Sequence, residues 1–327
     1  MKRKWFVLLG LLPLFLLSAC AAATNPLTKA MSTPVPGIPE TDHVAVAPAE
    51  QSNQMEIALF FRYQQTGLLA CETRTINIQT DESAEETVIR QLLAGPQASH
   101  TDLHRLFPHN AALVDTTVSG DILMVTLNEA LLNDGIPENW SSDPAWRTEA
   151  PLRRKLTMQS LVATITENFS YPYVQVFLVN DQASHVSTRL DSSYFLAGSS
   201  GPAELLYRDE SLLLTMQNAT LTILEAWYRR DYPLLYELTI SNTKSHGRPA
   251  YETFVRELDG SLSLTSYSAS SGHSPVGSSS ATIIADLSCR NDTQEIIRSS
   301  IPIRLICEDG IWKVPYSELQ RLMLLPD

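Results

Sequence analysis

Hydrophobic and polar positions divide the chain into four stretches. Residues 5–17 are almost wholly apolar after a basic start at residues 2–4, whereas residues 21–54 contain almost no large apolar side chain. From residue 55 onward, apolar positions recur at the spacings of strands and helices. The first apolar run is shorter than the ~20 residues that a membrane-spanning helix needs. It fits the core of a signal peptide over residues 1–19, and therefore predicts export.

Residues 55–200 show the alternation of a domain that mixes strands and helices. The predicted strands are 57–61, 68–78, 112–118, 122–127 and 173–179, and the predicted helices are 83–95 and 152–169. Ser83-Ala84-Glu85-Glu86 fits a capping box at the start of the first helix. Gly95-Pro96 is a favoured helix ending. The order β-β-α-β-β-α-β describes an α+β domain with its helices against one sheet face.

Residues 203–327 show a second pattern, with helices first and strands afterwards. The predicted helices are 212–230, 234–238 and 251–258, and the predicted strands are 262–268, 282–289, 295–307 and 311–314. Asp309-Gly310 is a preferred hairpin dipeptide between the last two strands. Residues 268–280, rich in Ser and Gly, are expected to form a loop. The chain as a whole is therefore expected to be α+β with two folded domains.

Charge narrows the classes of partner. The chain has 24 Lys and Arg against 36 Asp and Glu, a formal charge of −12. Removal of residues 1–19 takes away three basic residues and leaves −15. This excess of acidic residues argues against binding to nucleic acid, because such binding requires clustered cations on the protein. It also disfavours electrostatic attachment to anionic lipid.

The end of the signal segment carries a more specific motif. Leu17-Ser18-Ala19-Cys20 resembles the lipobox of bacterial lipoproteins. The resemblance implies cleavage before Cys20 and a diacylglyceryl group, with palmitate-type chains, on its sulfur. Two acyl chains hold a protein far better than one, at about 0.8 kcal/mol per buried CH₂. We therefore expect a protein anchored to the cell membrane on its extracytoplasmic face. The alternative is an ordinary cleavable signal with an accidental cysteine.

The segment that follows Cys20 is expected to be a stalk. Residues 20–54 are rich in Pro and Ala, and they contain too little large apolar surface to offset the entropy of ordering. A stretch of this composition acts as a linker, with a reach of roughly 100 Å if fully extended. It would hold the first domain away from the membrane.

Several segments of residues 55–200 together resemble a known family. They are Phe60-Phe61, Cys71-Glu72-Thr73-Arg74, the helix Val88-Ile89-Arg90-Gln91-Leu92-Leu93-Ala94-Gly95-Pro96, Leu106-Phe107-Pro108 and Met124-Val125-Thr126-Leu127-Asn128. These segments resemble the GerMN domain, also called the sporulation and spore germination domain. The resemblance implies a fold like that of the ring-building modules of cell-envelope assemblies, and it implies no catalytic residues. Members of the family are often lipoproteins of Gram-positive bacteria, which agrees with a lipid on Cys20. The germination protein that names the family has two such domains, whereas one is visible here.

The element order of residues 203–320 resembles the NTF2-like (cystatin-like) cone of helices and curved antiparallel sheet. The closing Asp309-Gly310-Ile311-Trp312-Lys313-Val314 is similar to the final strand of small extracytoplasmic members. Enzymes of this class place an Asp with a His or Tyr inside the cone. Here Tyr228, Asp231, Tyr232 and Tyr236 would lie near its mouth. The alternative is that the hydroxyl groups surround a helix end and that Asp231 caps the next turn.

Candidate catalytic and metal sites are few. His100, His104 and His109 lie close in sequence, but only the first pair has a helical spacing, and no Cys or carboxylate completes a metal shell with them. Ser199-Ser200-Gly201 and residues 278–280 have the composition of linker and loop, not of a nucleophile elbow. We expect no enzyme activity, no cofactor and no metal.

Two remaining features concern sulfur and tryptophan. If the last long hairpin turns at residues 291–293, Cys289 and Cys307 lie about twelve residues apart along the strands, roughly 40 Å, which is too distant for a disulfide. A strongly coiled sheet or a turn at another position is the alternative that would allow the pair. Cys71, Cys289 and Cys307 are therefore expected to be free thiols.

Trp140 and Trp146, in a polar loop at residues 133–151, are a possible contact surface. They could equally fold back onto their own domain.

Three functions, each from a different class of protein, are consistent with these features. The first is a non-catalytic cell-envelope interaction or assembly module that binds another envelope protein or a wall component, with sporulation or germination as the process that the family resemblance implies. The second is a lipoprotein that holds a small ligand in the C-terminal cone, which an apolar cavity there would support. The third is an enzyme, which a buried Asp231 facing a second acid or base would support. The lack of active-site motifs favours the first.

Overall fold

The computed structural model describes residues 53–78, 81–179, 186–241, 247–270, 272, 279–291 and 294–324. The predicted signal peptide, Cys20 and nearly all of the predicted linker lie outside the described residues, as do parts of the predicted loop at 268–280 and of the turn at 291–293. For description, residues 53–209 are called the N-terminal half and residues 210–324 the C-terminal half. The domain boundaries stay a prediction.

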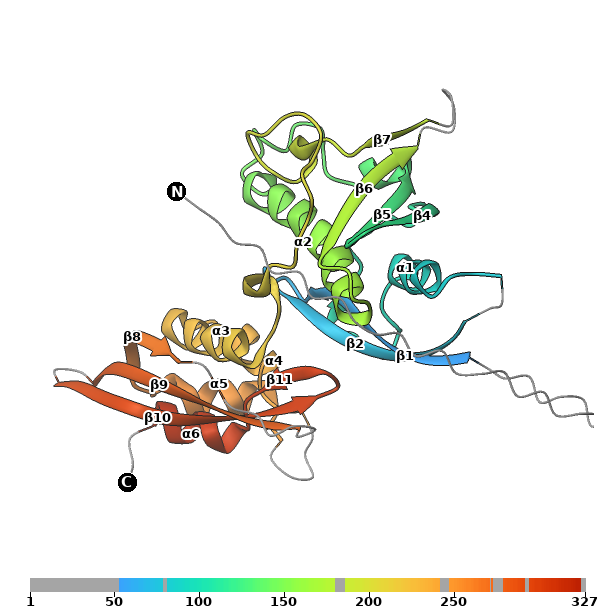
Figure 1. Ribbon diagram of the computed structural model, residues 1–327. Helices are drawn as coiled ribbons and strands as arrows, with labels where there is room; N and C mark the ends of the chain where they lie inside the picture. Colours follow the sequence, from blue (N-terminus) through green and yellow to red (C-terminus); the bar gives the residue numbers. More distant parts are fainter. Residues whose placement is uncertain are drawn as a thin grey trace, which may run out of the picture. The chain divides into compact units, whose positions relative to one another are not determined.

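The N-terminal half contains two separate sheets and two main helices (Figure 1). The first sheet has the order β2-β1-β3 and the second has the order β4-β5-β6-β7. The elements are β1 (Asn53–Tyr63), β2 (Leu69–Ile78), α1 (Ala84–Ala94), β3 (Leu103–His104), β4 (Leu113–Ser119), β5 (Ile122–Asn128), the 3₁₀ turn η1 (Glu129–Leu132), α2 (Trp146–Asn168), β6 (Tyr173–Val179), β7 (Ser187–Arg189) and the 3₁₀ turn η2 (Ser192–Tyr194). The mixed α+β class is confirmed, but the single sheet predicted for this half is wrong.

A polar stripe on α2 explains the division into two sheets. Thr164 accepts the N–H of Phe60 at 3.1 Å, and Ser160 donates to the Phe60 carbonyl at 2.5 Å. Asn168 makes a matching pair of bonds with the backbone of Ala58, at 2.9 and 2.7 Å. The three α2 residues are spaced four apart and so lie on one helical face. They satisfy the backbone of β1 where another strand would otherwise pair.

The first helix begins and ends where its sequence signals predict. The side chain of Ser83 accepts the N–H of Glu86 at 3.1 Å, which is the predicted N-cap. Val88, Ile89 and Leu92 face the core and are fully buried. Gly95 ends the helix with a positive φ of 91°, a conformation that favours glycine.

The C-terminal half has helices on a curled antiparallel sheet of order β11-β10-β9-β8 (Figure 1). Its elements are the 3₁₀ turn η3 (Glu210–Leu212), α3 (Met216–Arg229), α4 (Tyr232–Glu237), α5 (Tyr251–Asp259), β8 (Ser263–Ala269), β9 (Ser280–Asn291), β10 (Gln294–Glu308), β11 (Ile311–Lys313) and α6 (Tyr316–Met323). The predicted helix start at Leu212 is too early, because Thr215 is the N-cap and accepts the N–H of Asn218. Helix α6 was not predicted.

An apolar core fills the inner side of this sheet. Trp227, Phe254, Ile283 and Ile303 are at most 1% exposed. The indole N–H of Trp227 donates to the Leu262 carbonyl at 2.9 Å, so its one polar group is satisfied. Burial of each large apolar side chain contributes about 1.5–3 kcal/mol.

The three cysteines of the described residues test the prediction of free thiols. Cys289 lies opposite Ile296 and Cys307 lies opposite Trp312, so the two are far apart along β10. Both are free thiols, as is Cys71, which confirms the prediction for these residues. Burial raises the pKa of Cys71 to about 11. Within the described part of the chain, no helix has the length and apolar content needed to span a membrane.

Candidate functional site at the junction of the two halves

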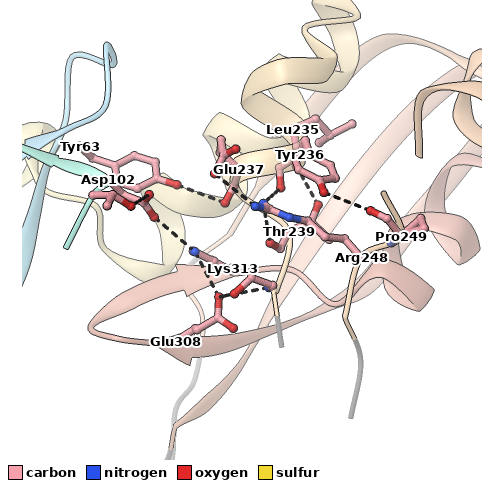
Figure 2. Close-up of polar contacts among 12 residues, drawn as sticks. Tyr63, Asp102, Leu235, Tyr236, Glu237, Thr239, Arg248, Pro249, Glu308 and Lys313 are labelled. Atoms are coloured by element: carbon pink, nitrogen blue, oxygen red, sulfur yellow. Dashed lines mark hydrogen bonds and ion pairs between the residues drawn. The ribbon is translucent and has the colours of Figure 1, made fainter. Parts of the chain in front are cut away.

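The end of β1 lies at a contact between the two halves. Tyr63, the last residue of β1, is fully buried, and its hydroxyl donates to the Glu237 carbonyl at 3.3 Å (Figure 2). Burial is the main cause that raises the pKa of this phenol, with the nearby carboxylates adding to it. The hydroxyl therefore stays protonated and remains a donor. It ties α4 to the first sheet.

Backbone contacts join the halves beside this phenol. Leu69, at the start of β2, forms a parallel bridge with Leu213, and the N–H of Leu214 donates to the Leu69 carbonyl at 2.7 Å. Leu213 also packs in a cluster with Phe60, Leu156 and other residues of the N-terminal half. The chain thus enters the C-terminal half along the edge of the first hairpin.

A buried lysine forms the ionic part of the junction (Figure 2). Lys313 on β11 is only 5% exposed, and its ammonium lies 3.1 Å from the Glu308 carboxylate and 3.5 Å from the Asp102 carboxylate. Glu308 also accepts the N–H and hydroxyl of Ser241, at 3.2 and 2.9 Å. Burial acts to raise the pKa of Glu308, but the bonds from Ser241 and the charge of Lys313 outweigh it and lower that pKa. One cation therefore holds carboxylates from both halves.

Arg248 forms a second cationic centre nearby. Its guanidinium lies over the ring of Tyr236, 3.7 Å from the ring centroid. It also donates to the carbonyls of Tyr236 and Thr239 and lies 3.4 Å from the Glu237 carboxylate (Figure 2). The Tyr236 hydroxyl donates to the Pro249 carbonyl at 3.1 Å. These contacts hold the short helix α4 in one orientation against the segment that follows residue 246.

A polar hollow of about 480 Å³ lies among these groups. Its lining residues come from both halves: Gln64, Ser99, His100, Thr101, Asp102, Glu237, Ser241, Arg248, Glu308, Asp309, Ile311 and Lys313. Buried Lys313 and half-buried Arg248 are both paired with carboxylates of the same lining. The chemistry available here is ion pairing and hydrogen bonding that connects the halves.

The predicted tryptophan surface is only partly exposed. Trp140 and Trp146 are both half-buried. The ring of Trp140 lies against the guanidinium of Arg154, 5.9 Å from its centroid, and Arg154 also pairs with Asp134 at 2.6 Å. Trp146 is the first residue of α2. The geometry of Trp140 fits the fold-back alternative, and a contact role for either residue stays a prediction.

The tyrosines and aspartate predicted near the mouth of the cone do not converge on one point. Asp231 is exposed and caps α4 by accepting a backbone N–H at 3.2 Å, which is the alternative that the sequence offered. The hydroxyls of Tyr232 and Tyr236 each donate to a backbone carbonyl. Tyr228 is 50% exposed. Asp231 therefore has a structural role as the N-cap of α4.

The three histidines are also separated. His100 lines the polar hollow, His104 lies opposite Arg62 in the β1–β3 pair, and His109 lies beside Arg105. Among the residues that the structure describes, no group of three or more His, Cys, Asp or Glu side chains is placed to hold a metal ion.

A second polar cluster was not predicted from the sequence, although its residues belong to the motifs quoted above. Glu72 is fully buried and pairs with Arg74 at 2.5 Å. Arg74 donates to the Gly95 carbonyl at 2.8 Å, and Glu72 accepts the N–H of Gln97 at 3.1 Å. The two charged residues are spaced two apart on β2 and so share the buried face. They hold the end of α1, and this explains why the strand motif and the helix motif occur together.

The residues of the junction were also missed as a set. Lys313 carries the signal that could have found it, because it alternates with Ile311 at an inward-facing position of a short strand. Asp102, Arg248 and Glu308 carry no comparable pattern, since each lies in or beside a loop. Only the folded chain brings them together.

The comparison with protein families concerns the N-terminal half. Residues 58–184 match the family model Germane, described as sporulation and spore germination, which confirms the predicted resemblance over that range. No curated protein matches the sequence.

Three solved structures are similar to parts of the chain. The tandem GerMN domains of the sporulation protein GerM from Bacillus subtilis are 13% identical, with a TM-score of 0.32; the match covers 52% of this chain and 49% of that one, about half its length. The first GerMN domain of the same protein is 11% identical, with a TM-score of 0.30 and coverage of 47% and 98%. A putative lipoprotein from Clostridium perfringens is 15% identical, with a TM-score of 0.23 and coverage of 43% and 89%. Residues 58–184 of this chain are thus similar to the sporulation and spore germination family.

Proposed function

We propose that this protein is a lipid-anchored, extracytoplasmic, non-catalytic module that binds another envelope protein or a wall component during sporulation or spore germination. The observation that carries the proposal is the match of residues 58–184 to the sporulation and spore germination family. The buried ions described above are engaged in structural pairs, which favours binding over catalysis. The acidic charge of the chain favours protein or wall partners over nucleic acid.

The anchor rests on the lipobox-like Leu17-Ser18-Ala19-Cys20 and on the composition behind it. A diacylated cysteine would hold the protein at the membrane without any basic surface. The Pro/Ala-rich residues 20–54 would set the folded part at a distance from the bilayer. In this arrangement the binding surfaces would face the cell wall.

We assign the C-terminal half to the NTF2-like class because of its element order. Helices α3 to α5 come first and the four strands of a curled antiparallel sheet follow. The alternative function, a small ligand held inside the cone, requires an apolar cavity there. Trp227, Phe254 and Ile283 occupy that interior and are buried. This packing favours a structural role for the cone, which fixes α4 and α5 beside the N-terminal half.

The anchor is tested by membrane fractionation of cells that produce the Cys20→Ser protein. We expect the variant to move from the membrane fraction to the soluble extracellular fraction, because it lacks the thioether-linked lipid. The matched control is Cys71→Ser, which changes a cysteine of the folded part and should leave the protein at the membrane. Retention of the Cys20→Ser protein in the membrane fraction would contradict the lipid anchor.

The binding function is tested by chemical crosslinking of the anchored protein in intact sporulating cells, followed by mass spectrometry of the crosslinked species. We expect a defined adduct with an envelope protein or a wall fragment. The adduct should decrease in the Cys20→Ser strain, where the protein is no longer held at the membrane. Recovery of monomer alone at all crosslinker concentrations would overturn the proposal.

A further inference from the structure

An apolar groove of about 800 Å³ lies beside the polar hollow of the junction. One wall is the turn between β1 and β2, and the other is formed by α4 with the first residue of α5. Its lining residues are Gln64, Gln65, Thr66, Gly67, Leu68, Thr222, Asp231, Pro233, Leu234, Tyr236, Glu237 and Tyr251. A groove of this volume accommodates several side chains of a peptide segment.

The turn that forms the first wall is fixed by hydrogen bonds. Arg62 donates to the carbonyls of Thr66 and Gln65 at 2.8 and 3.2 Å, and a bidentate pair with Glu149 holds the same guanidinium. The Thr66 hydroxyl donates to the Tyr63 carbonyl at 2.6 Å. Because these bonds exist before any partner arrives, little ordering would be needed on binding.

The second wall is equally well supported. The cap at Asp231 starts α4, and Pro233 lies in its first turn. Tyr236 is held from one side by Arg248 and meets the ring of Tyr251 edge-on, at 5.2 Å between centroids. Tyr251 is nevertheless 41% exposed. An exposed tyrosine on a rigid wall is a typical anchor point in protein interfaces.

The lining has a clear charge sign. It contains the carboxylates of Asp231 and Glu237 and no lysine or arginine, but Glu237 is already paired with Arg248 outside the lining, so Asp231 supplies the negative charge of the groove. Tyr236 and Tyr251 add aromatic surface, and Leu68 and Leu234 add aliphatic surface. Carboxylates and aromatic rings both attract cations, whereas the aliphatic groups require an apolar contact. The net charge of the chain, −12 with the signal segment included, acts in the same direction over longer range.

We propose that this groove is the docking site for a basic, amphipathic segment of the partner protein, with an apolar side chain between lysines or arginines. The inference rests on the proposed binding function and specifies where and by what chemistry the partner binds. The apolar side chain lies against Leu68 and Leu234, and the flanking cations face Asp231 and the ring of Tyr251. A wall glycan without cationic groups does not satisfy this lining.

The test uses two fluorescent eight-residue peptides, one alternating Lys with Leu and one alternating Glu with Leu, titrated against the mature chain carrying Cys20→Ser. We expect anisotropy to show binding of the Lys peptide only, weakened as salt is raised. Asp231→Asn removes the charge but keeps a residue suited to helix capping. It should weaken binding about tenfold, as should Tyr251→Ala, which equals about 1.4 kcal/mol each.

Matched controls come from outside the groove. Asp309→Asn removes the same charge from the neighbouring polar hollow, and Tyr228→Ala removes a tyrosine of similar exposure. Both should bind the Lys peptide as the parent does, and circular dichroism should match for all four variants. The proposed docking site would be wrong if the control variants weakened binding equally or if Asp231→Asn left binding unchanged. It would also be wrong if the Lys peptide did not bind. If crosslinking still yields a partner in that case, the proposed function stands and only this site fails.

Discussion

The two halves of the molecule treat buried polar side chains differently. Of the buried polar or charged residues in the described part of the chain, eleven lie in the N-terminal half and four in the C-terminal half. The N-terminal set includes the charged Arg62, Glu72, Arg74 and Asp134, all with hydrogen-bonded partners. The C-terminal set includes one charge, Lys313, and its ammonium reaches Asp102 of the N-terminal half.

The difference shows two ways of specifying a fold. In the C-terminal half, the alternation of apolar residues along β9 places one face in the core, and this alternation specifies the register. In the N-terminal half, buried ions and hydroxyls hold a helix end, a turn and a strand edge that apolar packing alone would leave free. Such networks are sensitive to the loss of one member. The two halves should therefore respond differently to conservative substitutions.

The largest expected effect is at Glu72. Glu72→Gln keeps the size of the side chain but leaves the guanidinium of Arg74 buried without its counter-charge. Breaking one partner of a buried pair costs about 3–5 kcal/mol of the free energy of unfolding. Urea denaturation followed by circular dichroism measures it. The control is Arg90→Gln, which breaks the Arg90–Glu82 pair, whose side chains are 48% and 27% exposed.

The control should lower the free energy of unfolding by no more than about 1 kcal/mol, as for surface pairs in general. If Glu72→Gln were equally mild, the buried network would not be what stabilises the N-terminal half. The two halves would then differ in how many polar side chains they bury, and not in what stabilises them.

A smaller effect is expected at the contact between the halves. Lys313→Met removes the cation shared by Asp102 and Glu308 and should lower the free energy of unfolding by about 2 kcal/mol, since hydrogen bonds to charged groups contribute about 1.5–3 kcal/mol. The matched control is Lys155→Met, because the Lys155–Asp209 pair is well exposed at 42% and 30%. Chemical denaturation of both variants provides the comparison. A Lys313→Met protein as stable as the control would show that the junction needs no ion.

The hydrophobic pattern predicted most long elements to within a few residues. The strand predicted at 173–179 has the observed bounds of β6, and the strand predicted at 295–307 differs from β10 by one residue at each end. Long amphipathic or apolar runs carry this signal because burial on one face imposes a period. Strands β3 and β7 have two and three residues, too few to show any period.

Other misses have specific physical causes. Helix α6 does carry a signal, because Leu319, Leu322 and Met323 are spaced three and four residues apart after Pro315. The last predicted element is the strand at 311–314, so the prediction missed this short helix. The polar stripe of α2 has no such signal. Thr164 is fully buried because a backbone N–H of another element needs its oxygen, and that partner is 104 residues away in the chain. At the junction, Lys313 shows an alternating pattern with Ile311, but Asp102, Arg248 and Glu308 show none, so hydropathy alone could not assign the set.

The stripe of α2 offers a matched pair of threonines for the next prediction. Thr164→Val should lower the free energy of unfolding by about 1–3 kcal/mol, because it leaves the buried N–H of Phe60 without an acceptor. Thr220 on α3 is equally buried, but within the described part of the chain its hydroxyl donates to the Met216 carbonyl of its own helix and to no other element. Thr220→Val should therefore change stability by less than about 0.5 kcal/mol. Thermal unfolding of the two variants decides the point, and similar losses would remove the distinction between the halves.

The smallest effect is a pH dependence at Glu308. Its pKa in the folded state is lowered from an ordinary value of 4.5, because the bonds from Ser241 and the charge of Lys313 outweigh its burial. A carboxylate with a lowered folded-state pKa stabilises the fold above its unfolded-state pKa, and this contribution is lost as the pH falls through the folded-state value.

The variant Glu308→Gln tests this contribution, because its side chain does not titrate. The stability difference between parent and variant should be constant near pH 7 and should shrink as the pH falls below about 4.5, the ordinary value for glutamate. Urea midpoints measured from pH 7 to pH 3 report it, with Glu295→Gln on exposed β10 surface as the control. A parent–variant difference that grows toward acid would mean that Glu308 is destabilised as a carboxylate. The junction would then be held by apolar contacts such as that of Leu213, and the ionic link between the two halves would be incidental.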